Sequence, residues 1–257
     1  MSKKTVYYSD ERNDDFAHSQ IDVRPLGADY RYIRREWYWK LASFILYRVI
    51  AQPLVFLMDK AIYLQCFRNR RVLRAIRGRG AYLYANHTNG MLDAYTPHIL
   101  RYARRTFIVS GPEAFSIRGI RTILEMLGTI PISTDFRQNV QMKACVQERV
   151  RRGNLVMIYP EAHIWPYYTG VRQTGTAPYS FPATDGAPVC TLTQCYKKRL
   201  IGRRPRVVTY VDGPFYPDMN LPLGERKKKL RDQCYETMRR RAAENSTYAY
   251  WEYKKRA

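Results

Sequence analysis

The chain has 257 residues, which is enough for one α/β domain with a substantial core and additional segments. Its apolar content of 46% excludes an intrinsically disordered chain. The net charge of +22, from 44 Lys and Arg against 22 Asp and Glu, requires an anionic partner or surface: nucleic acid, anionic lipid or a phosphorylated substrate.

Residues 1–33 are polar and carry an acidic patch. We interpret them as a flexible or loosely packed N-terminal arm. Because the chain is polar and charged throughout from Met1 to Arg35, we expect no cleavable signal peptide.

Residues 34–66 are apolar, and their pattern predicts two helices that meet near Gln52-Pro53, since proline breaks or kinks a helix. A transmembrane span needs about 20 clean apolar residues. Arg48 and Gln52-Pro53 interrupt this stretch, and Asp59-Lys60 end it. We therefore expect a membrane-associating pair of helices that lies in one leaflet. The alternative is a helical pair packed on the domain as part of its core.

From residue 67 to 245, apolar strands alternate with helical patterns. This predicts an α/β domain with a mostly parallel central sheet flanked by helices, preceded by the apolar helical pair. The expected strands are 81–85, 106–110, 129–133, 154–159, 187–193 and 206–212. The expected helices are 93–104, 113–126, 136–152 and 222–244. A basic, aromatic tail at 246–257 follows, and it could contact lipid as well.

The five cysteines are odd in number, form no Cys-x-x-Cys and have no histidine at zinc-site spacing. We expect reduced, mostly buried thiols and no metal site. Cys190, on an expected buried strand, is not expected to act as a nucleophile.

The residues that carry chemistry begin directly after the expected strand 81–85. There Asn86-His87 is followed by Asp93, within about one and a half to two helical turns. A histidine suits general-base catalysis near neutral pH, and a carboxylate fixes its tautomer and stabilises the imidazolium. A structural hydrogen bond is the alternative interpretation. The stretch 155–163 repeats the layout, with an apolar strand followed by a polar turn that carries Glu161.

Four segments in order resemble the motifs of the glycerolipid acyltransferase family. Asn86-His87 with Asp93 is similar to its first motif, Asn-His-x4-Asp. The stretch 127–132 with Arg137 is similar to the second, a strand ending near an arginine. Tyr159-Pro160-Glu161 resembles the third, usually Phe-Pro-Glu-Gly, and 187–192 resembles the fourth, an apolar strand holding a proline.

The first motif is one residue longer here, with five residues between His87 and Asp93 and with Leu92 at the usual aspartate position. Positions six apart lie about 240° round an uninterrupted helix, so the segment must be part turn and part helix. Gly90 supplies the freedom to absorb the extra residue. In the third motif Ala162-His163 replaces Gly-Thr, which suggests a changed phosphate-contacting turn or a different substrate.

The resemblance implies transfer of an acyl chain from a thioester, either acyl-CoA or acyl-carrier protein, to a hydroxyl of a lysophospholipid. The commonest such acceptor is 1-acyl-glycerol 3-phosphate, which gives phosphatidate. His87 would act as general base and Asp93 would hold it, with no metal, cofactor or covalent intermediate. Arginine forks would bind the substrate phosphate, and Glu161 would bind a glycerol hydroxyl or order an arginine. The expected substrate-binding residues are Asn86, Arg137, Pro160, Glu161 and Arg172.

We accordingly expect a peripheral or monotopic protein at the cytoplasmic face of the cell membrane, on an anionic membrane surface, and no nucleic-acid partner. Two alternatives stay open. The longer first motif suggests a lipid-binding relative without catalysis. The charge suggests a basic nucleic-acid-binding protein, although the sequence holds no recognisable reader motif and such a role leaves the apolar segment 41–65 unexplained.

Overall fold

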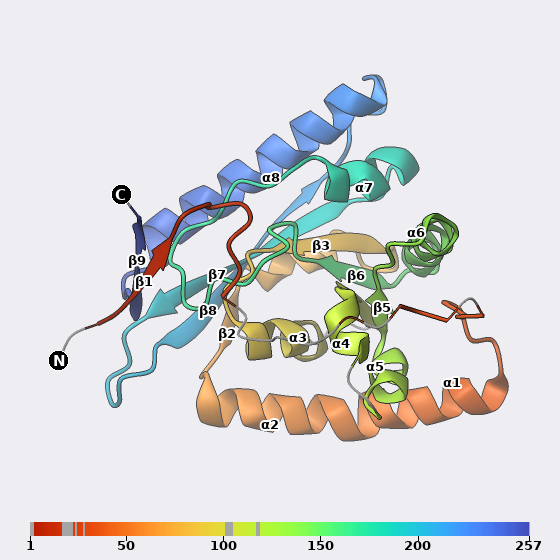
Figure 1. Cartoon of the computed structure of the whole chain (residues 1–257), viewed down its shortest axis with the longest axis horizontal. Helices are drawn as coiled ribbons and strands as arrows, with labels where there is room; N and C mark the ends of the chain where they lie inside the picture. Colours follow the sequence, from red (N-terminus) through yellow and green to blue (C-terminus); the bar gives the residue numbers. More distant parts are fainter. Residues whose placement is uncertain are drawn as a thin grey trace.

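A seven-stranded sheet forms the centre of the computed structural model, which describes residues 3–16, 23, 25–27, 29–100, 105–116 and 119–256 (Figure 1). The strands lie in the order β2-β8-β7-β3-β6-β4-β5. Neighbouring strands are parallel except β7 and β8, which form an antiparallel pair. Their bounds are β2 (Cys66–Arg68), β3 (Ala81–Ala85), β4 (Thr106–Ser110), β5 (Thr129–Pro131), β6 (Leu155–Ile158), β7 (Val189–Lys197) and β8 (Arg206–Phe215).

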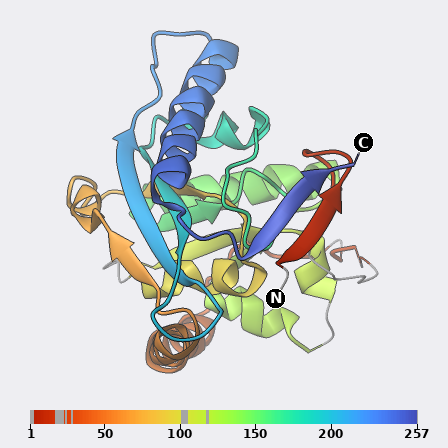
Figure 2. The same cartoon turned by 90° about the vertical axis from the view of Figure 1, so that its left-hand side faces the viewer.

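Helices cover both faces of this sheet (Figures 1 and 2). One face carries α6 (Phe136–Arg151), the short η3 (Ala177–Tyr179), α7 (Ser180–Asp185) and α8 (Leu223–Asn245). The other carries η2 (Arg70–Arg74), α3 (Gly90–Ile99), α4 (Pro112–Ser116) and α5 (Arg121–Leu127).

The central strand β3 is buried along its whole length. Tyr82 and Tyr84 pack into the core under α6 and α8, whereas Leu83 packs into the core on the opposite face. Burial on both faces explains why this strand is a continuous apolar run rather than an alternating one.

The predicted fold class, a mostly parallel sheet flanked by helices, is confirmed. The strands 81–85 and 106–110 have the predicted bounds, and the others differ by a few residues. The predicted helix 113–126 is instead the two helices α4 and α5, and Gly119 between them has a φ of 83°, which no helix accommodates. The predicted helix 93–104 begins earlier, at Gly90, and its last residues, 101–104, lie outside the described residues.

The predicted pair of apolar helices is wrong, because the segment forms one helix of 26 residues, Trp37–Ile62. It consists of α1 (Trp37–Phe44), the π-helical η1 (Ile45–Ala51) and α2 (Gln52–Ile62). Proline removes a backbone donor and crowds the carbonyl four residues before it. The wider π turns lie directly before Pro53 and carry the helix past it without a break. By length and composition alone, this helix could cross a membrane.

One side of this long helix packs on the domain. Its buried residues are Ser43, Tyr47, Ala51, Val55 and Asp59, each four positions from the next. Positions four apart drift by roughly 40° on a regular α-helix, and the wider π turns reduce that drift. The opposite side exposes large apolar side chains: Trp37, Tyr38, Leu41, Phe44, Ile45, Val49, Ile50, Leu54 and Leu57.

The two ends of the chain pair with each other. The strand β1 (Lys4–Tyr8) runs parallel to β9 (Trp251–Lys255) as a separate two-stranded sheet (Figure 2). Residues 4–8 are therefore not the loosely packed arm that their polarity predicted, because the basic tail supplies a partner strand. The arm residues 1, 2, 17–22, 24 and 28 lie outside the described residues.

All five cysteines are free, four of them buried and Cys66 partly exposed. Burial raises the pKa of the Cys190 thiol to about 12, so this group is a poor nucleophile near neutral pH.

Candidate active site

His87 lies in the turn between the carboxyl end of β3 and the start of α3. Asn89 is the N-cap of α3, and its side chain accepts a hydrogen bond from the backbone N–H of Leu92 at 3.2 Å. Asp93 stands in the first turn of α3 and reaches back toward the cap, where its Oδ2 accepts from the backbone N–H of Asn89 at 3.0 Å. The segment is thus part turn and part helix, as the longer spacing required.

This geometry brings the Nδ1 of His87 to 2.7 Å from the same oxygen, Oδ2 of Asp93. A carboxylate at Nδ1 favours the tautomer with the proton on that nitrogen, which leaves Nε2 as the proton acceptor. The His87 side chain is 15% exposed, whereas Asp93 is 1% exposed. The arrangement suits a base that is open on one side and fixed on the other.

Gln194 on β7 completes the surroundings of Asp93. Its side-chain amide donates a hydrogen bond to Oδ1, the carboxylate oxygen that His87 does not use. Both carboxylate oxygens of Asp93 therefore have a side-chain hydrogen-bond partner. Nothing in the sequence motifs pointed to Gln194, which lies 101 residues from Asp93.

Tyr159 packs against one face of the His87 imidazole. Its ring stacks on the imidazole with centroids 4.4 Å apart and planes at 20°. Its hydroxyl donates a 2.6 Å hydrogen bond to the backbone oxygen of Asp93. Tyr159 therefore limits rotation of the imidazole and ties β6 to the first turn of α3. The sequence indicated only that this position belongs to the third motif.

The buried side chain of Asn86 is hydrogen-bonded to the backbone of Gln194. Its side chain accepts from the backbone N–H of Gln194 at 2.8 Å and donates to the backbone oxygen of Gln194 at 3.1 Å. Asn86 is fully buried. Its contacts hold β3 and the histidine turn against β7, so the structure gives it a positioning role in place of the predicted substrate contact.

Glu161 and Arg172 form a buried ion pair, with Arg172 Nε 3.1 Å from Glu161 Oε2. Burial raises the pKa of Glu161, and the Arg172 guanidinium opposes that shift. Arg172 also donates to the backbone oxygens of Glu11, at 3.2 Å, and of His163. Because its guanidinium is engaged by internal acceptors, Arg172 orders the loop here rather than presenting a free fork to a phosphate.

The loop after β6 is hydrogen-bonded to the histidine turn. The backbone N–H of Trp165 donates to the backbone oxygen of His87 at 3.0 Å, and that of Tyr167 donates to Thr88 at 2.7 Å. Trp165 is fully buried, and its ring lies 5.0 Å from the Arg172 guanidinium. The long connection is therefore an integral part of the site.

The N-terminal segment lies over this loop. The indole of Trp165 donates to the backbone oxygen of Asp14 at 2.8 Å, and the backbone N–H of Ile164 donates to Asp15 Oδ1 at 3.1 Å. Sequence reasoning gave these acidic residues no role, because the contact joins positions about 150 residues apart.

The remaining two predicted site residues also follow the carboxyl-terminal ends of strands. Pro160 is buried and lies two residues after the end of β6. Arg137 is exposed in the first turn of α6, beyond the edge strand β5. Two strands, β6 and β4, separate β5 from β3, so Arg137 starts roughly 14 Å from the histidine turn. The structure thus brings together His87, Asp93, Asn86, Pro160, Glu161 and Arg172, with Arg137 at the margin.

No group of three or more His, Cys, Asp or Glu side chains that could hold a metal ion occurs among the described residues. Fold and site together define an α/β protein with a hydrogen-bonded His–Asp pair at the carboxyl-terminal ends of the strands of a mostly parallel sheet, where such sheets place their ligands.

Comparison with known proteins bears on the family. Residues 64–187 match the Acyltransferase family. The structure is similar to the solved structure of the 1-acyl-sn-glycerophosphate (LPA) acyltransferase PlsC from Thermotoga maritima, with a TM-score of 0.57 and 16% identity over 80% of this chain and 86% of that one. Among curated proteins no sequence matches. The domain match and the shared fold support the assignment to the glycerolipid acyltransferase family that the motifs predicted.

Proposed function

We propose that this protein transfers an acyl chain from an acyl thioester to a hydroxyl of a lysophospholipid, with His87 as general base. The observation that carries the proposal is the 2.7 Å contact between His87 Nδ1 and Asp93 Oδ2, despite the extra residue between them. The pair forms because Asp93 folds back over the helix N-cap.

In this mechanism Nε2 of His87 takes the proton from the acceptor hydroxyl while the oxygen attacks the thioester carbonyl carbon. The tetrahedral intermediate collapses, the C–S bond breaks, and the thiolate takes the proton from Nε2. The products are an ester and a free thiol. Asp93 stabilises the imidazolium that exists between these two proton transfers.

The proposed acceptor is 1-acyl-glycerol 3-phosphate, and the product is then phosphatidate. The support is the family and the fold shared with a protein whose title names it an LPA acyltransferase. Arg137 is the proposed phosphate ligand, because it is exposed at the carboxyl edge while Arg172 is already paired. Acyl-CoA and acyl-carrier protein are both candidate donors, and no further cofactor is required by this chemistry.

The proposed location is the cytoplasmic face of the cell membrane, in peripheral or monotopic form. The long helix packs one side on the domain and exposes apolar side chains on the other, so it lies along the domain rather than projecting from it (Figure 1). Such a helix can bury its apolar side in one leaflet. The net charge of +22 favours an anionic surface.

The test is thiol release by the detergent-purified protein. Palmitoyl-CoA and acyl-carrier protein donors are offered against lysophosphatidate, glycerol 3-phosphate and neutral lysolipids. The variant His87→Ala is compared with His163→Ala, which removes a partly exposed histidine from the neighbouring loop. We expect release that depends on lysophosphatidate and that only His87→Ala abolishes.

Turnover indifferent to His87 would overturn the proposed base. Lipid binding without turnover for any pair would instead favour a relative without catalysis. Nucleic acid that co-purifies with the protein and is removed by high salt would favour the nucleic-acid alternative.

A further inference from the structure

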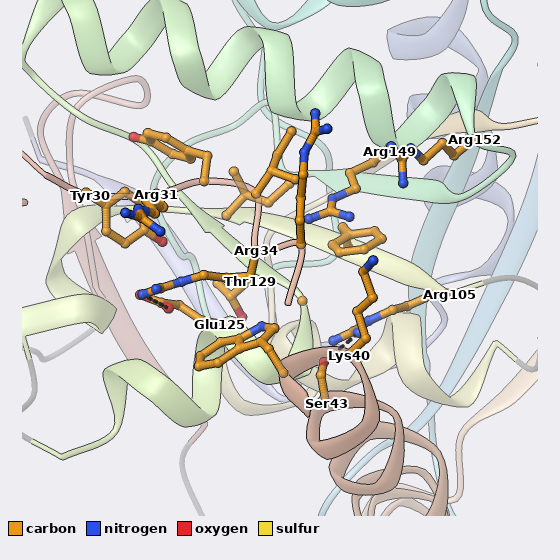
Figure 3. Close-up of a pocket in the computed structure, with 17 residues that line it drawn as sticks. Tyr30, Arg31, Arg34, Lys40, Ser43, Arg105, Glu125, Thr129, Arg149 and Arg152 are labelled. Atoms are coloured by element: carbon orange, nitrogen blue, oxygen red, sulfur yellow. Dashed lines mark hydrogen bonds and ion pairs between the residues drawn. The ribbon is translucent and has the colours of Figure 1, made fainter. Parts of the chain in front are cut away.

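A cluster of basic residues lies at the amino-terminal ends of the strands, on the opposite side of the sheet's strand ends from His87. It lines a pocket of about 230 Å³ between the segment before α1, the first turns of α1, and the last turn of α6 (Figure 3). Its cationic lining residues are Arg31, Arg34, Arg35, Lys40, Arg105, Arg149 and Arg152, and its one lining carboxylate is Glu125.

The pocket is separate from the proposed active site. Arg105 directly precedes β4, and Gly128 directly precedes β5, so both mark the amino-terminal ends of strands. His87 and Glu161 follow the carboxyl ends. The five residues of β4 span roughly 15 Å, which is the thickness of sheet between the two edges.

Two of these cations pair with carboxylates outside the lining, Arg31 with Glu36 at 3.6 Å and Arg152 with Glu148 at 2.5 Å, and others lack a counter-charge. Glu125 lies 3.8 Å from Arg34 and 3.4 Å from Arg121, outside the lining, so it is already shared. In the described part of the chain, no ion pair joins an acidic side chain to any of four lining cations: Arg35, Lys40, Arg105 and Arg149.

Arg105 and Arg149 form the floor of the pocket. The guanidinium of Arg105 donates to Ser43 Oγ at 2.7 Å and to the backbone oxygen of Met126, and that of Arg149 lies 4.6 Å from the ring of Phe107. The buried Nε atoms of both arginines have no hydrogen-bond partner among the described residues. Burial and the nearby charge of Arg149 lower the pKa of Arg105 to about 10. Concentrated cations with unsatisfied donors are stabilised by a bound anion.

The neighbouring surface indicates where that anion comes from. Trp39, Lys40 and Ser43 of α1 line the pocket. Trp37, Leu41 and Phe44 of the same turns are 75%, 52% and 58% exposed. When that apolar side enters a leaflet, the pocket opens at the level of the headgroups, where tryptophan and arginine are favourable.

We propose that this pocket binds the phosphate group of an anionic phospholipid, apart from the acceptor bound at His87. The inference rests on the membrane placement proposed above. Guanidinium forks match phosphate oxygens, and the surplus of cations favours a doubly charged phosphomonoester, as in phosphatidate, over the single charge of a phosphodiester.

The test is binding of the full-length protein to vesicles of phosphatidylcholine with phosphatidate, with phosphatidylglycerol at equal surface charge, or with neither. The variant Arg35→Gln/Lys40→Gln removes two exposed cations at the pocket mouth. The control Lys228→Gln/Arg240→Gln removes the same charge from exposed positions on α8, on the far face of the domain. We expect the pocket variant to weaken binding to phosphatidate vesicles about tenfold or more, and the control to change it less than about threefold.

If both variants lost the same binding to phosphatidate vesicles, the proposed phosphate site would be wrong, and only a diffuse attraction between the basic protein and the anionic surface would remain. Equal binding to the two anionic lipids would overturn the choice of a phosphomonoester. Full competition by millimolar inorganic phosphate or glycerol 3-phosphate, without preference for phosphatidate vesicles, would assign the pocket to a soluble ligand instead. His87→Ala should leave vesicle binding unchanged, so failure of the catalytic proposal and failure of this one are distinguishable.

Discussion

Gln194 and Asp93, which lie on β7 and α3, share a hydrogen bond that occupies the carboxylate oxygen left free by His87. The backbone of Gln194 is in turn fixed by the side chain of Asn86, the residue before the histidine. The proposed general base, His87, is thus held by contacts from three elements, β3, α3 and β7.

The first prediction concerns Gln194→Leu. It leaves the buried Oδ1 of Asp93 without its donor, which weakens the hold of the carboxylate on the imidazolium. A hydrogen bond to a charged group contributes about 1.5–3 kcal/mol, so we expect kcat to fall roughly 10- to 100-fold with KM little changed. Steady-state kinetics with varied acceptor measure both. An unchanged kcat in a protein with a lowered melting temperature would limit Gln194 to a structural role.

The second prediction separates the ring of Tyr159 from its hydroxyl. Tyr159→Phe keeps the ring against His87 and loses only the hydrogen bond to the backbone of Asp93. Tyr159→Leu loses both. We expect a loss of stability of about 1 kcal/mol and nearly full kcat for Phe, and a kcat reduced several-fold or more for Leu. Equal kcat in the two variants would show that the stacked ring does not position the histidine.

The third prediction concerns the buried ion pair of Glu161 and Arg172. Arg172→Met leaves a buried carboxylate without its partner, and we expect the free energy of unfolding to fall by about 3–5 kcal/mol. The double variant Glu161→Gln/Arg172→Met should lose less than the sum of the two single variants, because neither charge is left alone. Denaturant unfolding of the four proteins measures the coupling. Additive losses would mean that the two side chains do not stabilise each other.

The fourth prediction is a pH dependence from His98, whose ring centroid lies 4.8 Å from that of Tyr47. Burial and the nearby Arg105 lower the pKa of His98 to about 4. Between the unfolded value of about 6.5 and pH 4, the unfolded chain binds a proton that the folded protein does not. The free energy of unfolding therefore falls as the pH is lowered through this window, by up to about 3 kcal/mol.

His98→Phe keeps a ring against Tyr47 and removes this proton. The difference in unfolding free energy between wild type and variant should change by about 2–3 kcal/mol between pH 7.5 and 4.5, measured by denaturant unfolding. A difference that is constant with pH would show that His98 protonates equally in both states.

Much of the fold could be predicted because the buried strands are short apolar runs bounded by polar turns. The strand 81–85 has its predicted bounds since both of its faces are buried. Pro53 led to the prediction of two helices, because sequence reasoning treats an internal proline as a break and could not foresee the π turns before it. The pairing of β1 with β9 joins the two ends of the chain, and no local pattern encodes such a contact.

The candidate site was predictable only where a motif carries it. His87, Asp93 and Glu161 stand together in the structure. The pairing of Glu161 with Arg172 corresponds to one of the two roles expected for this carboxylate, the ordering of an arginine. Gln194 could not be found from the sequence, because its contribution depends on the register of β7 beside β3.

The central claim is that the longer motif positions Asp93, and not residue 92, as the partner of His87. Leu92 is fully buried in a separate apolar cluster, so a carboxylate moved there cannot face the imidazole. The deciding measurement is acceptor-dependent thiol release by Asp93→Asn and by the exchange Leu92→Asp/Asp93→Leu, beside wild type. We expect Asp93→Asn to lower kcat by roughly 10²- to 10⁴-fold, and the exchange not to restore it. Wild-type turnover in Asp93→Asn, or rescue by the exchange, would contradict it.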